Sequence, residues 1–254
     1  MKKIIPFIRS LLFCIISFVI TVPWSFIFVF LDMIPFLKNR KYISDRIASC
    51  WGAFCIWLLK ITCGISCDIK GYDKLEKGKS YIIIGKHEST YETLIMHTFM
   101  RPAPIYVLKK QLKYVPFMGW CLASSNQIAI DRSAGGAAVR IILKEGKKYL
   151  AKGHNIIIFP QGTRTPPTAT LEEYPYKVGF LGMIKQFKVD IVPLALNTGK
   201  YWGKGQFIKK SGVIKMEYME PIKYEDIKDL TNEELLVKLR DIIEKRSKEL
   251  YEQD

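Results

Sequence analysis

The first long pattern in the chain is an apolar segment without charges, residues 10–31, which reads SLLFCIISFVITVPWSFIFVFL. It is long enough to cross a bilayer, and no small-residue cleavage site of a signal peptide follows it. Basic residues flank it on both sides, with Arg9 before and Lys38 after. Lys and Arg favour the cytoplasmic side of a membrane, and Pro23 is expected to break a helix. We therefore favour a hairpin or oblique anchor that enters and leaves from one face; a single span is the alternative.

A second apolar stretch, residues 47–61, carries Trp51, Phe54, Trp57 and Leu58 at helical spacing. Two interpretations remain open: a helix in the membrane interface beside the first segment, or an ordinary core helix. We expect residues 1–62 to form an N-terminal membrane-anchoring helical part and residues 63–254 to form the remaining domain.

Beyond the anchor, short apolar runs rich in β-branched residues alternate with segments of helical periodicity. This alternation predicts an α/β fold with a mostly parallel central sheet flanked by helices. The last helical segment has the pattern of an amphipathic helix that covers a core. The expected strands are 81–84, 105–108, 127–130, 156–159, 190–196 and 212–217, and the expected helices are 91–99, 134–152, 179–187 and 232–252.

Polar or glycine-containing turns follow four of the expected strands. Ligand sites of open α/β sheets are built where the carboxyl ends of parallel strands meet. We therefore expect these turns to converge at one edge of the sheet. They are residues 85–87, 131–133, 160–164 and 197–199.

The formal net charge of the chain is +15, which favours binding to anionic surfaces. The basic residues form no recognisable nucleic-acid-binding motif, so anionic membrane lipids are the expected partner and nucleic acid is not. The lysine-rich stretch 200–215 is either a solvated rim or a contact for acidic headgroups. The six cysteines lack the spacing of a zinc site and are expected to be buried free thiols in a reducing cytoplasm.

The most informative stretch runs from Lys86 to Thr93 and begins where an expected strand ends. His87 is followed five positions later by Glu92, whose carboxylate can orient the imidazole if His87 precedes the helix. The alternative is purely structural, because Ser89 and Glu92 also have the spacing of a capping box. No GxSxG nucleophile motif is present, so a base at His87 is expected to act on a substrate hydroxyl.

Two further strand ends carry arginines. In residues 159–164, FPQGTR, Gly162 permits close backbone approach and Arg164 offers a guanidinium suited to phosphate. The alternative is a tight turn with a surface arginine. Asp131 and Arg132 form the other strand end, where they either contribute to a site or merely cap and pair.

Four blocks follow one another along the chain: His87 to Glu92; Lys109, Leu112, Pro116 to Trp120 and Ile130 to Arg132; Phe159 to Arg164; and Ile191 to Asn197. In this order they resemble the 1-acyl-sn-glycerol-3-phosphate acyltransferases of the bacterial lysophosphatidic acid acyltransferase type. The resemblance covers about residues 69–220. Two positions depart from the family pattern: Glu92 replaces Asp and Gln161 replaces Glu. The first change keeps the charge that orients His87, whereas the second removes a negative charge near Arg164.

The resemblance implies transfer of a fatty acyl group from acyl-CoA or acyl carrier protein to the sn-2 hydroxyl of lysophosphatidic acid. The product would be phosphatidic acid, an intermediate of phospholipid biosynthesis. It implies His87 as general base, oriented by Glu92. The expected location is the cytoplasmic face of a bacterial inner membrane, with no metal and no cofactor besides the acyl donor.

The same resemblance assigns the acceptor phosphate to Arg164, supported by Lys109 and Arg132. Backbone N–H groups near Gly162 and Thr163 are the expected oxyanion or positioning groups. The aromatic and apolar stretch 114–122 either lines the acyl groove or belongs to the core. Alternative functions are transfer to glycerol-3-phosphate or another lysolipid, and a non-catalytic membrane lipid-binding protein.

Overall fold

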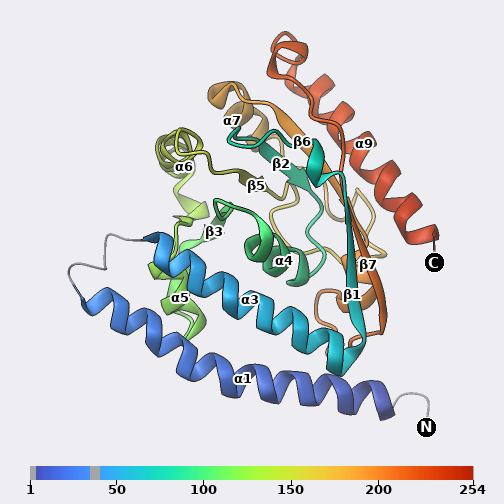
Figure 1. Ribbon diagram of the computed structural model, residues 1–254. Helices are drawn as coiled ribbons and strands as arrows, with labels where there is room; N and C mark the ends of the chain where they lie inside the picture. Colours follow the sequence, from blue (N-terminus) through green and yellow to red (C-terminus); the bar gives the residue numbers. More distant parts are fainter. Residues whose placement is uncertain (1–3, 35–40, 254) are drawn as a thin grey trace.

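The computed structural model describes residues 4–34 and 41–253, without the side chains of Asp32, Met33, Lys41 and Arg132. Its centre is a seven-stranded sheet in the order β1-β7-β6-β2-β5-β3-β4 (Figure 1). The strands are β1 (Ile65–Lys70), β2 (Ile82–Gly85), β3 (Ile105–Lys109), β4 (Ile128–Ile130), β5 (Ile156–Ile158), β6 (Ile191–Leu196) and β7 (Gly212–Tyr218).

The sheet is mostly parallel, as the alternating pattern predicts. Strands β6, β2, β5, β3 and β4 run in one direction, whereas β7 pairs with β6 in the antiparallel sense and β1 pairs with β7 in parallel. Sequence reasoning missed β1, because ISCDIK is a half-buried edge strand with little apolar patterning. The carboxyl ends of the five parallel strands share one edge of the sheet.

Helices cover both faces of the sheet. On β2, Ile82 and Ile84 face one core, shared with α6, α7 and α9, while Ile83 faces the other, shared with α1, α3 and α4. The helices are α1 (Ile4–Met33), α3 (Lys41–Cys63), α4 (Tyr91–Phe99), α5 (Met118–Ser124), α6 (Gly136–Leu150), α7 (Gly179–Phe187), α8 (Thr198–Trp202) and α9 (Asn232–Glu252).

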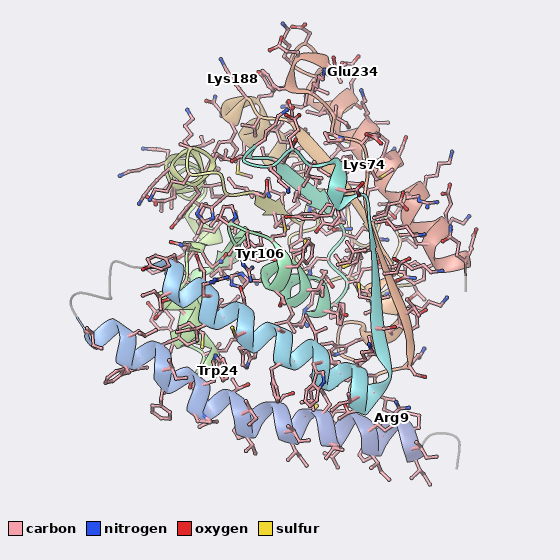
Figure 2. All side chains as sticks on the ribbon, in the orientation of Figure 1. Arg9, Trp24, Lys74, Tyr106, Lys188 and Glu234 are labelled. Carbon is pink, nitrogen blue, oxygen red and sulfur yellow. The ribbon has the colours of Figure 1, made fainter. Side chains whose placement is uncertain are left out.

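The first apolar segment forms one continuous helix, so the break expected at Pro23 is wrong. Helix α1 packs antiparallel against α3 (Figure 1). No hairpin forms within residues 10–31, and entry and exit from one membrane face stays a prediction. The Trp24 indole donates to the Ile47 carbonyl at 3.3 Å, and the Trp51 indole donates to the Thr21 hydroxyl at 3.0 Å. Figure 2 shows Trp24 on the side of α1 that faces the rest of the molecule.

Helix α3 is a core helix on one side, and its placement in a membrane interface stays a prediction. Its inner face is buried at Leu58 and Leu59, and Gly52 lies so close to α4 that an added Cβ would be 2.5 Å from the Thr98 hydroxyl. Its outer face leaves Trp57 54% exposed. The helix is therefore a core element on one side and an exposed apolar surface on the other. The expected division of the chain at residues 62 and 63 stays a prediction.

The lysine-rich stretch is not simply a solvated rim. Lys209 is only 4% exposed, and its ammonium group lies 5.2 Å from the Phe13 ring centroid and 5.0 Å from that of Trp202. Its backbone N–H donates to the Ser10 hydroxyl at 2.8 Å, which fastens α1 to the segment before β7. Lys204 and Lys210 are exposed, so headgroup contact remains a prediction for them.

The cysteines also differ in part from expectation. All six are free, but Cys50 is exposed while Cys55 and Cys63 are buried.

Candidate active site

His87 and Glu92 meet at the carboxyl end of β2. The chain leaves the strand at Gly85 and enters α4 at Tyr91, so His87 lies in the connecting loop. Nδ1 of His87 is 2.7 Å from Oε1 of Glu92, and the Glu92 side chain is fully buried. The longer side chain of glutamate therefore reaches the imidazole.

The same carboxylate oxygen also serves the backbone. Oε1 of Glu92 accepts the N–H groups of Glu88 and Ser89, each at 2.9 Å. The Ser89 hydroxyl accepts the N–H of Tyr91 at 3.1 Å, and Thr90 is the N-cap residue of α4. Only half of the expected capping box is therefore present, because Glu92 accepts the Ser89 N–H while the Ser89 hydroxyl accepts from Tyr91 and not from Glu92. Glu92 stabilises the loop before its own helix and also contacts the histidine.

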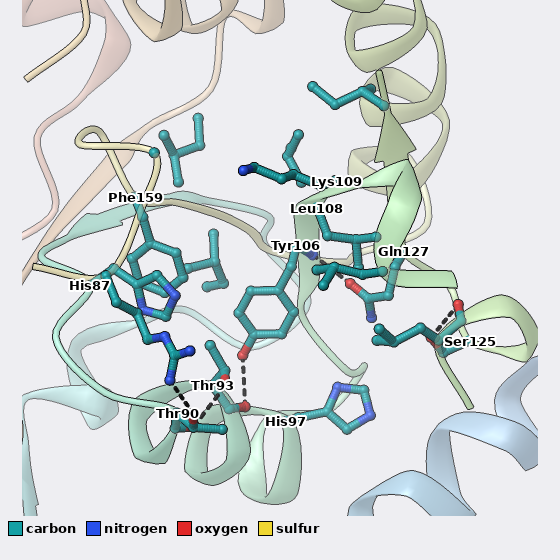
Figure 3. Close-up of a pocket in the computed structure, with 18 of the residues that line it drawn as sticks. His87, Thr90, Thr93, His97, Tyr106, Leu108, Lys109, Ser125, Gln127 and Phe159 are labelled. Carbon is teal, nitrogen blue, oxygen red and sulfur yellow. Dashed lines mark hydrogen bonds between the residues drawn. The ribbon is translucent and has the colours of Figure 1, made fainter. Parts of the chain in front are cut away.

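Phe159, the residue after β5, fixes the other side of the imidazole. The rings of His87 and Phe159 are stacked, with centroids 4.2 Å apart and planes 13° apart (Figure 3). A carboxylate can only accept, so Nδ1 carries the proton that is shared with Glu92. Nε2 then keeps its lone pair and is the atom that can remove a proton.

The loop after β5 is joined directly to the histidine loop. Thr165 donates its backbone N–H to the His87 carbonyl at 2.7 Å. Gly162 has φ +70°, the left-handed conformation that favours glycine, and its N–H donates to the Phe159 carbonyl at 2.9 Å. That N–H is therefore engaged in the turn. A positioning role for Gly162 stays a prediction, and the oxyanion prediction is restricted to Thr163.

Basic side chains lie beside His87. Arg164 is exposed, donates to the Thr90 hydroxyl at 2.9 Å and lines the same cavity as His87. Lys109, at the end of β3, also lines this cavity, as does Lys177, which sequence reasoning missed because no motif surrounds it. The Arg132 side chain lies outside the described part of the structure.

Asp131 has the capping role that was its alternative. Its carboxylate accepts the N–H of Ser133 at 3.0 Å and the Ser133 hydroxyl at 2.6 Å. These hydrogen bonds lower the pKa of Asp131 below its ordinary value.

A cavity of about 780 Å³ extends from His87 into the apolar interior between the helices. Trp24 and Phe28 of α1 form part of its wall, together with residues of α3, α4, α5 and α6. The stretch 114–122 divides: its later residues line the cavity, whereas Tyr114 is 75% exposed. Figure 3 shows His87, Phe159, Tyr106 and Lys109 around this space.

Three of the four expected turns converge, whereas the convergence of residues 131–133 stays a prediction. The turns after β2, β5 and β6 are joined by direct hydrogen bonds, since Gly199 donates its N–H to Glu88 at 3.0 Å and Thr165 donates to His87. Sequence reasoning assigned no role to Glu88, Phe159 or Thr165. The contacts of Glu88 with Gly199, and of Phe159 and Thr165 with His87, connect residues 72 or more positions apart, which local patterns do not reveal.

Residues 66–197 match a family model described as Acyltransferase. The chain belongs to the acyltransferase family. It is 32% identical over 210 residues to the 1-acyl-sn-glycerol-3-phosphate acyltransferase of Pseudomonas aeruginosa, covering 82% of this chain and 78% of that protein. It is 30% identical over 185 residues to the enzyme of the same name from Saccharomyces cerevisiae, covering 72% of this chain and 60% of that protein. The family resemblance of the sequence blocks is thereby confirmed.

This acyltransferase also shares its fold with a solved structure. The 1-acyl-sn-glycerophosphate (LPA) acyltransferase PlsC from Thermotoga maritima superposes with a TM-score of 0.75 at 20% identity, covering 98% of this chain and 99% of that chain. The likeness confirms the α/β architecture with its N-terminal apolar helix.

Two helices of the described acyltransferase chain, spanning Ile4–Leu31 and Tyr42–Cys63, are long and apolar enough to cross a membrane. In the most apolar 18-residue stretch of each helix, only 17% and 39% of the residues, respectively, are buried. This pattern is consistent with membrane association.

Proposed function

We propose that this acyltransferase moves a fatty acyl group from a thioester donor to the sn-2 hydroxyl of lysophosphatidic acid and forms phosphatidic acid. The observation that carries the proposal is the 2.7 Å contact between His87 and Glu92 at the cationic end of an apolar cavity. This contact supports a base at a position where a phosphate and an alkyl chain can be bound together. The names of the relatives support the choice of acceptor.

In the proposed reaction, Nε2 of His87 removes the proton of the acceptor hydroxyl as its oxygen attacks the thioester carbonyl. The tetrahedral intermediate then collapses, the C–S bond breaks, and the leaving thiolate takes the proton from the imidazolium. Glu92 stabilises that imidazolium and keeps Nε2 directed at the substrate. The backbone N–H of Thr163 is the proposed donor to the oxyanion.

Arg164 is the proposed main ligand of the acceptor phosphate. Its guanidinium can form two parallel hydrogen bonds with a phosphate, and its attachment to Thr90 keeps it close to the start of α4. Lys109 and Lys177 add positive charge around the same cavity. Arg132 keeps its proposed supporting role. Acyl-CoA and acyl carrier protein both remain proposed donors, and the reaction as proposed requires no metal.

The anchor is proposed to lie in the plane of the cytoplasmic membrane surface. A helix of 30 residues is about 45 Å long, yet α1 contacts the rest of the protein near both ends. Phe7 packs on Phe207 with centroids 5.3 Å apart, and Phe26 packs on Trp120 at 5.7 Å. A helix crossing the bilayer would carry one end away from the domain.

The outer face of α1 supports this placement, because its large apolar side chains are 39% exposed or more. They are Ile4, Ile5, Ile8, Leu11, Leu12, Ile15, Phe18, Val19, Ile27 and Phe30.

The test is an acyl-transfer assay with purified full-length protein, labelled acyl-CoA or acyl carrier protein, and three competing acceptors: lysophosphatidic acid, glycerol-3-phosphate and another lysolipid. Labelled phosphatidic acid is the expected main product. His87→Ala should abolish turnover without loss of fold or vesicle binding. Near-normal turnover of His87→Ala, or preference for another acceptor, would contradict the proposal.

A further inference from the structure

Glu88, the residue after the proposed base, is a fully buried carboxylate outside the mechanism described above. Its Oε2 accepts the N–H of Gly199 at 3.0 Å and the hydroxyl of Tyr251 at 2.6 Å. Its Oε1 lies 3.5 Å from the ammonium group of Lys86. An acidic residue is rarely fully buried without partners, and here three different segments of the chain provide them.

Lys86, the residue before His87, also contacts the C-terminal helix α9. The ammonium group of Lys86 is 3.1 Å from Oε2 of Glu244 in α9, and Oε1 of Glu244 accepts the Tyr176 hydroxyl at 3.0 Å. Both neighbours of His87 are thus attached to the C-terminal helix, at Glu244 and at Tyr251.

The contact with Gly199 requires close approach. A Cβ at position 199 would lie 3.0 Å from both Cβ and Oε2 of Glu88, so glycine leaves the room that the carboxylate needs. Burial raises the pKa of Glu88, while Lys86, Tyr251 and Gly199 act in the opposite direction and favour the charged form. Burial also raises the pKa of Tyr251 and keeps its hydroxyl protonated as a donor.

These contacts complete the support of the His87 loop. Glu92 contacts the ring of His87, and Thr165 donates a hydrogen bond to its carbonyl. Glu88, the next residue, is hydrogen-bonded to Gly199 of α8 and to Tyr251 of α9. A loop attached on every side keeps the imidazole in one place, and small errors in the placement of a catalytic group cost much of the rate.

We propose that Glu88 is a positioning residue for His87 and that Tyr251 completes its site, so that the C-terminal helix α9 sets the orientation of the base. The inference rests on the proposed role of His87 as that base. Neither Glu88 nor Tyr251 contacts the substrate in this scheme.

The first test compares Tyr251→Phe, Glu88→Ala and the double variant, using the full chain in the acyl-transfer assay. Tyr218→Phe is the matched control, since it removes a buried hydroxyl whose partner is Met100 rather than the His87 loop. We expect kcat to fall about tenfold in Tyr251→Phe and more in Glu88→Ala, with KM for donor and acceptor within about twofold of wild type. The double variant should match Glu88→Ala, because both changes interrupt one contact.

Rescue separates positioning from a merely structural role. Glu88→Gln keeps a side-chain oxygen that can accept from Tyr251, so it should retain more turnover than Glu88→Ala. Equal kcat in Tyr251→Phe and Tyr218→Phe, or losses that multiply in the double variant, would overturn the proposal.

A second measurement does not depend on activity. In protein with ¹⁵N-labelled histidine, Tyr251→Phe should change the ring nitrogen signals of His87, whereas Tyr218→Phe should not. Unchanged His87 signals in Tyr251→Phe would also overturn the positioning role. If wild type and His87→Ala behave as expected and Tyr251→Phe is fully active, only the positioning inference fails. If His87→Ala is active, the proposed function itself fails.

Discussion

The ring of Phe159 lies flat against the imidazole of His87, with centroids 4.2 Å apart. The buried carboxylate of Glu92 contacts Nδ1 of His87. The stacked ring of Phe159 restricts rotation of the His87 side chain about its χ angles. The histidine is thus held by one hydrogen bond and one stacked face. This arrangement makes the aromatic residue part of the support of the base.

Replacement of Phe159 should therefore slow the reaction without changing the acid–base groups. We expect Phe159→Leu to lower kcat by roughly ten- to hundredfold, because the imidazole loses the surface that keeps its orientation. Phe159→Tyr retains the ring and should stay within a few-fold of wild type. Steady-state kinetics of both variants make the comparison, and equal rates would exclude a role for the stacked ring.

Glu92 offers a direct test of side-chain length. Glu92→Gln should lower kcat by about three to four orders of magnitude, since it no longer stabilises the imidazolium or the required tautomer. Glu92→Asp restores the residue usual in the family but shortens the side chain by about 1.5 Å.

In this loop the longer glutamate side chain reaches Nδ1 of His87. We therefore expect kcat of Glu92→Asp to lie between that of wild type and that of Glu92→Gln. Activity at or above wild type in Glu92→Asp would show that the 2.7 Å contact is not required.

Arg164 should affect the acceptor more than the donor. Arg164→Ala is expected to raise KM for lysophosphatidic acid by roughly ten- to a hundredfold, the loss of about 1.5–3 kcal/mol from a charged hydrogen bond. KM for the acyl donor should change little. Arg140→Ala is a suitable control, because Arg140 is an exposed arginine of α6. A larger effect on the donor would remove Arg164 from the phosphate site.

His97 should make the fold sensitive to acid. Burial lowers the pKa of His97 below its ordinary 6.5; Asp45 opposes that shift and Arg101 adds to it. As pH falls through about 6.5, the unfolded chain binds a proton that the native state does not, so the free energy of unfolding decreases.

We expect His97→Leu to lose less stability than wild type between pH 7.5 and 5.5, because it lacks the group whose pKa is lowered on folding. Denaturant unfolding of both proteins at the two pH values measures this difference. Parallel losses in the two proteins would contradict the assignment.

Membrane binding should depend on the outer face of α1. Ile15 and Val19 are 52% and 58% exposed, so Ile15→Glu with Val19→Glu should release the protein from anionic vesicles while the fold persists. Val237→Glu on α9, where the valine is 38% exposed, is the matched control and should still bind. Vesicle sedimentation measures both. Retained binding of the α1 variant would show that another surface attaches the protein.

The elements with strong periodicity could be predicted closely from sequence. Helices α4, α7 and α9 have the predicted bounds, because their apolar faces meet the core at regular spacing. The break at Pro23 was mispredicted, since contacts with α3 and α5 support the continuous helix α1. The edge strand β1 was not predicted, because most of its residues are only half buried and show little apolar patterning.

The candidate site divides in the same way. His87, Glu92 and Arg164 stand in local motifs, so their proximity at strand ends could be inferred. Glu88 and Tyr251 are 163 positions apart, and their contact follows from how α9 packs on the sheet. No pattern within one segment contains that information.

The share of α1 in the cavity wall has a practical consequence for handling this protein. Trp24 and Phe28 face the space beside the proposed base, so deleting the N-terminal helix to obtain a more soluble enzyme would open that space to water. Detergents with long alkyl chains would compete with the acyl group for the same apolar walls. Purification in short-chain detergents or lipid nanodiscs is therefore the condition under which rates and inhibitors are best compared.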